Sequence, residues 1–185
     1  MSSATITGIA RKATGWSIIV SIFLIIAGIL AIGMPHEAGI AVNIFVGWIL
    51  VFAAGAHFVY AWFTRGAGGV LLKFLIGLLY LVIAIYLLEH PARGLATLTL
   101  ALAFYLLIEG VMEIILFLQH RKSGAAGWYL VDGIITLILG FLVWRTWPSS
   151  AEWVIGTLVG ISLVFSGISR LMFSMVLRKA LSGPA

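Results

Sequence analysis

The sequence predicts an all-α membrane protein in which six transmembrane helices form three tandem two-helix hairpins. Three observations predict this fold: an apolar composition, six long apolar stretches and an internal repeat. Of the 185 residues, 63% are hydrophobic and 9% are charged, and the mean hydropathy is +1.20. Soluble domains are about a quarter charged, and a globule of this size has too little interior to hide so much apolar surface. We therefore expect a single membrane domain over residues 1–185.

Each of the six stretches is long enough to cross a bilayer, which takes about 20 mostly apolar residues. The first stretch follows Arg11 and Lys12, as a secretory signal would, but its apolar run is longer than a signal core. No convincing small-residue cleavage site follows, so we expect a retained helix. The connections are short and leave no room for a soluble domain. The expected spans are residues 14–34, 38–63, 70–89, 94–118, 127–147 and 152–177.

The chain also repeats itself along its length. Pro35, Pro91 and Pro148, one in every second turn, lie 56 and 57 residues apart. A period of this length indicates a repeated supersecondary unit, here a two-helix hairpin. The repeats cover approximately residues 14–65, 70–121 and 127–178. Because each copy crosses the membrane twice, all copies begin on the same side, and we expect them to form a pseudo-threefold bundle.

Small residues recur at fixed distances after each proline. Positions eight, twelve and nineteen residues on share one helix face, and small side chains on such a face let helix backbones approach closely in lipid. Position eight holds Asn43, Thr99 and Gly156. We expect helix packing at positions twelve and nineteen and at Gly156; a contact between copies of a homo-oligomer is the alternative. The predicted packing residues are Gly47, Ala54, Ala103, Gly110, Gly156, Gly160 and Gly167.

Ionisable residues lie inside the predicted spans at matching depths. The position 22 residues after each proline holds His57, Glu113 or Arg170. Glu109 lies one helical turn from Glu113, and Asp132 lies near the same end of the fifth span. A charge at such a depth costs about 2.5–3.5 kcal/mol, so these side chains should face the bundle interior and pair. We expect Arg170 to pair with Asp132 or Glu113, and His57 with the remaining acid.

Three interpretations of this buried polar network are open. A structural network that fixes the register of the helices is the simplest. A proton-responsive site is the second, because Glu109 and Glu113 stack on one helix face and two such carboxylates cannot both ionise cheaply away from water. A pathway for a proton or small solute is the third.

Lysine and arginine side chains predict the orientation of the spans. Eight of the eleven lie in the terminal segments and in the connections without proline, whereas Arg93 and Arg145 lie at the proline turns. By the positive-inside rule, both termini should be cytoplasmic. The basic residues are scattered over turns and form no nucleic-acid recognition element, so their expected partner is the lipid bilayer; no other protein partner is predicted.

No signature of an enzyme is present. The sequence lacks HExxH, a Walker lysine loop, GxSxG and a phosphate-binding glycine fingerprint, so no catalytic or cofactor-binding residue is predicted. With no cysteine, thiolate metal sites and disulfides are excluded. His36 and Glu37 in a proline turn have no further ligand at metal spacing, and no metal site is expected.

These features resemble the HdeD family of bacterial inner-membrane proteins, from about Trp16 to Arg178. The resemblance rests on three tandem two-helix repeats that turn at a proline, carry small residues at fixed offsets and close with Arg65, Arg121 or Arg178. It implies a multi-pass protein of the bacterial inner membrane, associated with acid resistance or general stress tolerance. The family implies no enzymatic activity and supplies no established site residues.

Two classes of function follow. The first is a non-enzymatic membrane protein that supports acid or envelope stress tolerance through proton sensing or scaffolding. The second is a small proton or solute transporter or channel. Transporters of this size place helix breaks near the membrane midplane, whereas this chain keeps its internal prolines in turns. The sequence therefore favours the first class.

Overall fold

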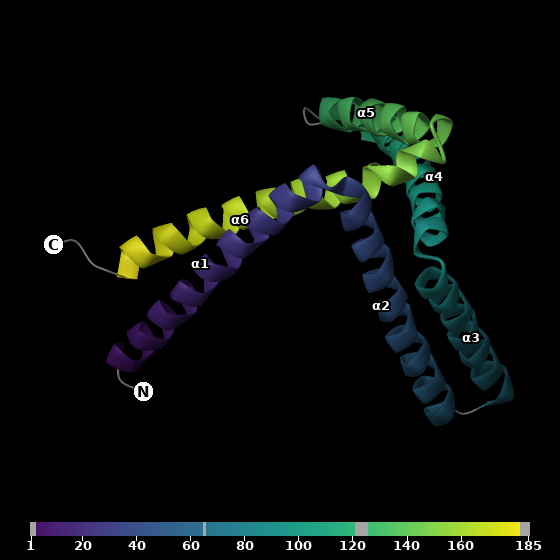
Figure 1. The fold of residues 1–185 in the computed structure, drawn as a ribbon, viewed down its shortest axis with the longest axis horizontal. Helices are drawn as coiled ribbons and strands as arrows, with labels where there is room; N and C mark the ends of the chain where they lie inside the picture. The colour runs from purple at the N-terminus through teal and green to yellow at the C-terminus, as the bar shows by residue number, and fades with distance from the viewer. Residues whose placement is uncertain (1–2, 65, 121–125, 182–185) are drawn as a thin grey trace. The chain divides into compact units, whose positions relative to one another are not determined.

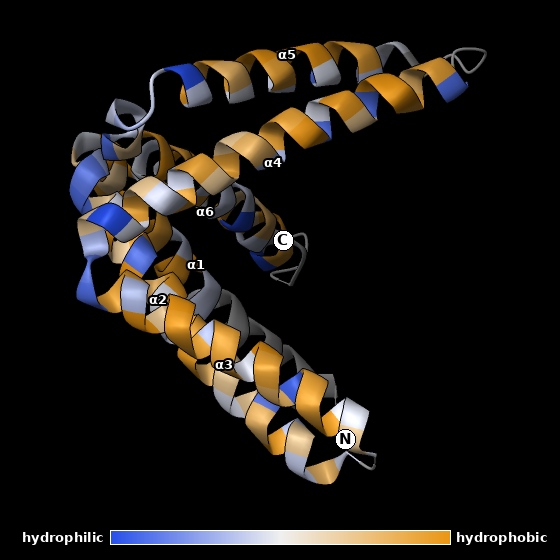
Figure 2. Cartoon of the chain, turned by 90° about the vertical axis from the view of Figure 1, so that its right-hand side faces the viewer, coloured by the Kyte–Doolittle hydropathy of each residue, from blue (hydrophilic) through white to orange (hydrophobic). Residues whose placement is uncertain are grey.

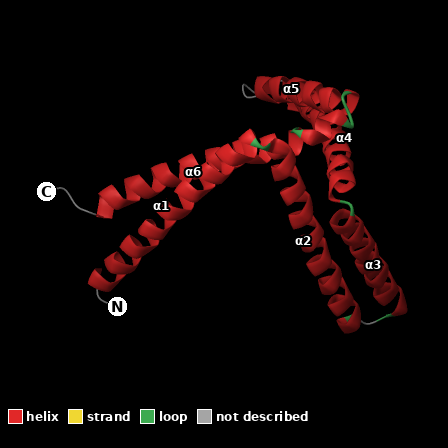
Figure 3. Cartoon of the chain, in the orientation of Figure 1, coloured by secondary structure: helices red, strands yellow, loops and turns green. Residues whose placement is uncertain are grey.

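The structure, a computed structural model, is helical apart from short turns in the residues that it describes, 3–64, 66–120 and 126–181. Six long helices and one short 3₁₀ helix follow one another along the chain (Figures 1 and 3). All six long helices are long and apolar enough to cross a membrane, which confirms the predicted spans. The elements are α1 (Ser3–Gly33), α2 (Pro35–Phe63), α3 (Ala67–Glu89), α4 (Pro91–His120), α5 (Ala126–Arg145), η1 (Ser149–Glu152) and α6 (Val154–Leu181).

Large apolar side chains cover the outside of the helices. Figure 2 shows hydrophobic residues along most of the length of the helices, with hydrophilic residues mainly near their ends. Phe52 and Phe173 are 72% and 71% exposed. The buried residues, in contrast, are mostly small, such as Ala54, Ala84 and Ala103. A helix that is apolar all round and buries only small residues is suited to lipid, because lipid offers no hydrophobic drive for large residues to turn inward.

Prolines begin two of the helices. Pro35 is the first residue of α2 and Pro91 is the first residue of α4, with only Met34 and His90 between these helices and the preceding ones. The first helical position suits proline because its N–H would have no partner there. The end of the helices at these turns is called the proline end below.

The third proline turn differs from the other two. Pro148 precedes η1, and α6 begins only at Val154. Ser150 in η1 is fully buried and its hydroxyl donates to the carbonyl of Val143 at 2.9 Å. The indole N–H of Trp147 donates to the carbonyl of Ala96, also at 2.9 Å. The last proline interval is 57 residues instead of 56, and we attribute the extra residue to this longer connection.

The chain divides into two compact units. One contains Met1–Ala38 and Gly156–Ala185, and the other contains Gly39–Ile155. In the first unit α1 packs along α6, and a hydrogen bond of 2.8 Å joins Ser174 to Ser17. In the second unit α2 packs along α3, and α4 packs along α5 (Figures 1 and 2).

The close helix pairs are therefore offset by one helix from the sequence repeats. A repeat begins with an odd-numbered helix, whereas each pair joins an even-numbered helix to the odd-numbered helix after it, and α6 to α1. The reason lies in the small-residue stripes of the even helices, which face these partners. Of the arginines expected to close the hairpins, Arg65 and Arg121 lie outside the described residues, as does Lys122.

Candidate functional site

The contact between the two helices of each pair, called the seam below, is lined by small residues. All seven predicted packing residues are buried. In the α2·α3 seam, Gly47 lies against Leu87 and Leu88. In the α4·α5 seam, Gly110 lies so close to α5 that an added methyl group would be 2.8 Å from the carbonyl oxygen of Gly133. Glycine is needed where two backbones approach this closely.

The α1·α6 seam has the same construction. Gly156 lies against the carbonyl of Pro35. An added methyl group would lie 2.9 Å from the carbonyl oxygen of Gly28 at Gly160, and 2.9 Å from that of Ser21 at Gly167. The α4·α5 and α1·α6 seams therefore place positions twelve and nineteen of the even helices against small residues of the partner helix, whereas in the α2·α3 seam Gly47 meets leucine side chains.

That partner face was missed by the sequence analysis. Each odd helix carries two buried small residues seven positions apart, and in α1 and α5 these residues oppose the stripe of the even helix. A seven-residue interval of this kind is the signal of left-handed helix packing. Offsets counted forward from the prolines did not reveal it, because these residues precede the prolines. They are Ser21 and Gly28, Gly77 and Ala84, and Gly133 and Gly140.

The α4·α5 seam brings together two of the predicted acids from different helices. An added methyl group at Gly133 would lie 3.1 Å from the Cβ of Glu113, so Glu113 packs directly over this glycine. Asp132 directly precedes Gly133 on α5, and its carboxyl group is close enough to interact with that of Glu113. Glu113 Oε2 is buried and accepts no hydrogen bond from the described residues.

Glu109 extends this group along α4. It lies one helical turn from Glu113 and is partly buried, and the hydroxyl of Tyr105 donates to its Oε1 at 3.2 Å. Three of the five residues of the predicted polar network, Glu109, Glu113 and Asp132, thus lie on one pair of helices. We call these three residues the acid cluster.

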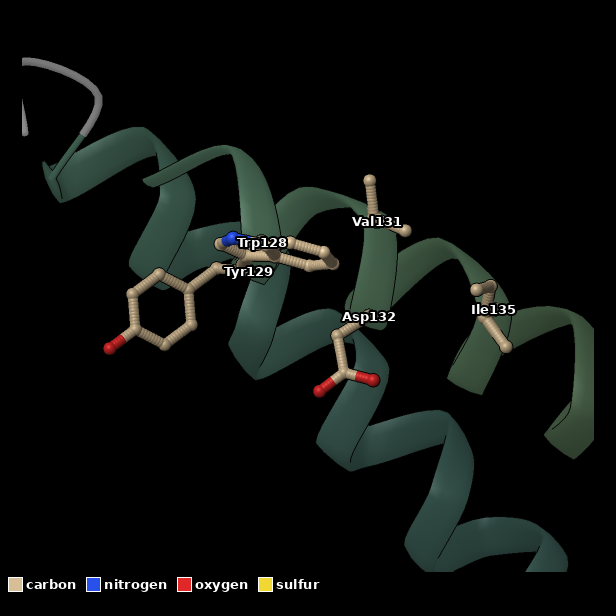
Figure 4. A pocket seen from close by; sticks show the side chains of 5 residues that line it. All are labelled: Trp128, Tyr129, Val131, Asp132 and Ile135. Carbon is tan, nitrogen blue, oxygen red and sulfur yellow. The ribbon is translucent and has the colours of Figure 1, made fainter. Parts of the chain in front are cut away.

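A surface hollow adjoins the acid cluster on α5. It is lined by Trp128, Tyr129, Val131, Asp132 and Ile135. Figure 4 shows Asp132 pointing toward α4 and Val131 pointing away from it. Asp132 is exposed in this hollow, whereas Glu113 is partly covered by the seam. Of the acid cluster, Asp132 is therefore open to this hollow.

His57 occupies the corresponding place in the α2·α3 seam. An added methyl group at Gly77 would lie 3.2 Å from the Cβ of His57, as at Gly133 for Glu113. The imidazole ring packs edge-on against the ring of Tyr80, with 5.2 Å between centroids. Its Nδ1 is buried and has no hydrogen-bond partner among the residues described. His57 and Glu113 thus occupy equivalent places in two different pairs.

Arg170 belongs to the other compact unit, on α6, where its side chain is exposed. The predicted pairing of Arg170 with Asp132 or Glu113, and of His57 with the remaining acid, stays a prediction. In the described part of the chain, no three His, Asp or Glu side chains are grouped so that they could hold a metal ion.

The fold and the acid cluster define a multi-pass α-helical membrane protein built from tandem repeats, with carboxylates in one of its helix seams. Comparisons with known proteins also indicate a protein built from tandem repeats. A family model described as a short repeat of unknown function matches residues 19–89 and again residues 75–145. The chain belongs to this family. The two matches begin 56 residues apart, which is also the interval between Pro35 and Pro91.

Curated relatives carry the name "Protein HdeD". The proteins of Escherichia coli K12, Escherichia coli O157:H7 and Shigella flexneri are each 25% identical to this chain over 163 residues, covering 86% of it and 85% of the relative. This similarity confirms the resemblance to the HdeD family. No solved structure matches the chain significantly.

Proposed function

We propose that this chain is a non-enzymatic protein of the bacterial inner membrane that supports acid or envelope stress tolerance. The acid cluster of α4 and α5 is its proton-responsive element. The observation that carries the proposal is the position of Glu113, which packs over Gly133 in the seam and beside Asp132. The resemblance to the HdeD family supports the physiological role.

The physical argument starts from the cost of charge in the membrane. Each ionised carboxylate at this depth costs about 2.5–3.5 kcal/mol, and two neighbouring carboxylates repel each other in addition. When both are ionised, Glu113 and Asp132 therefore repel each other across the seam. Because Glu113 lies in the seam, a change in proton occupancy alters the contact between α4 and α5, which is how a pH switch acts in a helix bundle.

The proposed orientation places both termini in the cytoplasm. It rests on the excess of lysine and arginine in the terminal segments and in the connections on the side opposite the proline turns. The acid cluster then lies in the cytoplasmic half of the membrane, because Glu113 is in the second half of α4, away from Pro91.

The proposed arrangement of the three helix pairs is pseudo-threefold. Support comes from the likeness of the seams: α4 with α5, and α6 with α1, place positions twelve and nineteen after the proline against small residues of the partner helix. A threefold relation between repeats requires seams that are alike. Transport is the less favoured function, because each described span is a continuous helix without a midplane break.

Deletion of the gene in its bacterial host tests the proposed role. We expect survival in acid to fall at least tenfold, with unchanged growth at neutral pH, and plasmid-borne wild-type protein to restore survival. A deletion strain that survives acid as well as its parent would contradict the proposal. A growth defect at neutral pH on a defined nutrient would instead favour transport.

A further inference from the structure

A fully buried asparagine at the proline end of the second unit has no place in the proposed function. Asn43 on α2 is 0% exposed, and its side-chain N–H donates to the carbonyl of Leu87 on α3 at 2.8 Å. Its Oδ1 accepts no hydrogen bond from the residues that the structure describes. Burying a side-chain amide in an apolar membrane protein is costly unless the amide forms hydrogen bonds.

Pro91 leaves the carbonyl of Leu87 without its usual hydrogen-bond donor. In a continuous helix the carbonyl of Leu87 would accept from the N–H four residues later, but that residue is Pro91, which has none. The carbonyls at a helix end require other donors, and water does not reach this one because Leu87 is 1% exposed. Asn43 reaches across from α2 and satisfies this carbonyl at the junction between α3 and α4.

The first turn of α4 is shaped to receive Asn43. An added methyl group at Gly94 would lie 2.6 Å from Asn43 Oδ1 and 2.9 Å from a methyl group of Leu87. Leu95, next on α4, is 1% exposed and packs against Gly39 of α2. Residues of α2, α3 and α4 therefore meet at one buried point, which we call the Asn43 node: Gly39, Asn43, Leu87, Gly94 and Leu95.

The equivalent position of the third repeat differs. Gly156 stands eight residues after Pro148, as Asn43 stands eight residues after Pro35. It lies against the carbonyl of Pro35, at the junction between α1 and α2, and has no side chain to donate. In the second repeat Thr99 occupies this position, and its hydroxyl donates within its own helix to the carbonyl of Leu95 at 2.9 Å.

We propose that Asn43 is a lock, a side chain whose hydrogen bond holds the α3–α4 junction closed, and that no residue in the described part of the chain locks the α1–α2 junction in this way. Local opening of the chain at the proline end therefore occurs first at Met34 and Pro35. The boundary between the two compact units at Ala38 and Gly39 falls beside the unlocked junction.

Two backbone amides report on the two junctions. The N–H of Gly94 donates to the carbonyl of His90 at 2.8 Å, and the N–H of Ala38 donates to the carbonyl of Met34 at 3.0 Å. Each lies three residues after its proline, so the two are matched. Hydrogen exchange of these amides, measured by NMR in lipid nanodiscs and corrected for intrinsic rates, compares the junctions within one molecule.

We expect the amide of Gly94 to be protected at least about tenfold more than that of Ala38. Asn43→Ala leaves a buried carbonyl unsatisfied. It should therefore speed exchange at Gly94 about tenfold and leave Ala38 within twofold. Thr99→Val, which removes a buried hydrogen bond within one helix, is the control and should leave both amides within threefold.

A second variant covers the case in which Asn43→Ala does not fold. Gly94→Ala crowds the amide of Asn43 away from Leu87, and it should speed exchange at Leu95 while sparing Ala38. The lock is overturned if Gly94 and Ala38 are equally protected in the wild-type protein. It is equally overturned if neither variant changes exchange in the first turn of α4.

Discussion

At the residue scale, the small side chains in the seams allow the helix backbones to approach closely. The sequence predicted the buried stripes of the even helices from their spacing alone, because a repeat makes weak preferences recur at countable positions. It could not predict the partner face on the odd helices or that Asp132 lies beside Glu113. Both depend on which helices form pairs, and the pairs cross the repeat boundaries. The contact of Gly133 with Glu113 is therefore information that only the structure supplies.

Gly160 tests the close packing of the seams. We expect Gly160→Leu to lower the melting temperature in detergent by about 5 °C or more, because the new side chain collides with Ile32 and with the carbonyl of Gly28. Leu100→Ile changes shape at a partly exposed site and should change it by less than about 2 °C. Equal melting temperatures would show that the seam does not need glycine.

Arg170 tests the expected charge pairing. If Arg170 pairs with Asp132, Arg170→Ala should destabilise the protein more than the double change with Asp132→Ala, since the single change leaves an uncompensated acid in the membrane. Thermal stability of both single variants and the double variant gives the coupling. The same comparison is made with Glu113→Ala in place of Asp132→Ala. If the stability changes of the single variants add up to that of the double variant in both comparisons, Arg170 does not pair with either acid.

At the scale of helices, α6 and α1 form a pair although they are farthest apart in the sequence. The repeat predicted hairpins from neighbouring helices, whereas the pairs follow the small-residue faces. The third proline turn also departs from the other two, because the extra residue in its interval accompanies a longer connection with its own 3₁₀ helix.

Cysteine cross-linking tests the α1·α6 seam directly, because the wild-type chain contains no cysteine. Ser17 and Ser174 are joined by a hydrogen bond of 2.8 Å between their hydroxyls. We expect Ser17→Cys with Ser174→Cys to form an intramolecular disulfide on mild oxidation. Ser17→Cys with Ser166→Cys, which places the second cysteine two turns away on an exposed face of α6, is the control. Equal cross-linking in the two variants would contradict the packing of α1 along α6.

At the scale of the whole molecule, the six spans were predictable and the arrangement of the pairs was not. Hydropathy placed the second span at 38–63, and α2 covers Pro35–Phe63. Apolar composition decides whether a helix enters the membrane, and this is a local property of the sequence. How the pairs assemble depends on contacts between faces that are uniformly apolar and therefore carry little pattern.

Orientation can be tested with single cysteines in intact cells. We expect Ser149→Cys to be labelled by a membrane-impermeant thiol reagent and Ser2→Cys to be labelled only after the cells are opened, since the positive-inside rule places the termini in the cytoplasm. The reverse pattern would mean that the chain is inserted the other way round.

The proton-responsive acid cluster is the central claim, and Glu113→Gln tests it most directly. Glutamine keeps the shape and hydrogen-bonding capacity of a protonated glutamic acid but cannot titrate. In a deletion strain, Glu113→Gln produced at the wild-type level should fail to restore acid survival, whereas Glu37→Gln, at an exposed carboxylate of the first proline turn, should restore it fully. Protection by Glu113→Gln equal to that of the wild type would contradict the claim and leave the acid cluster a structural network.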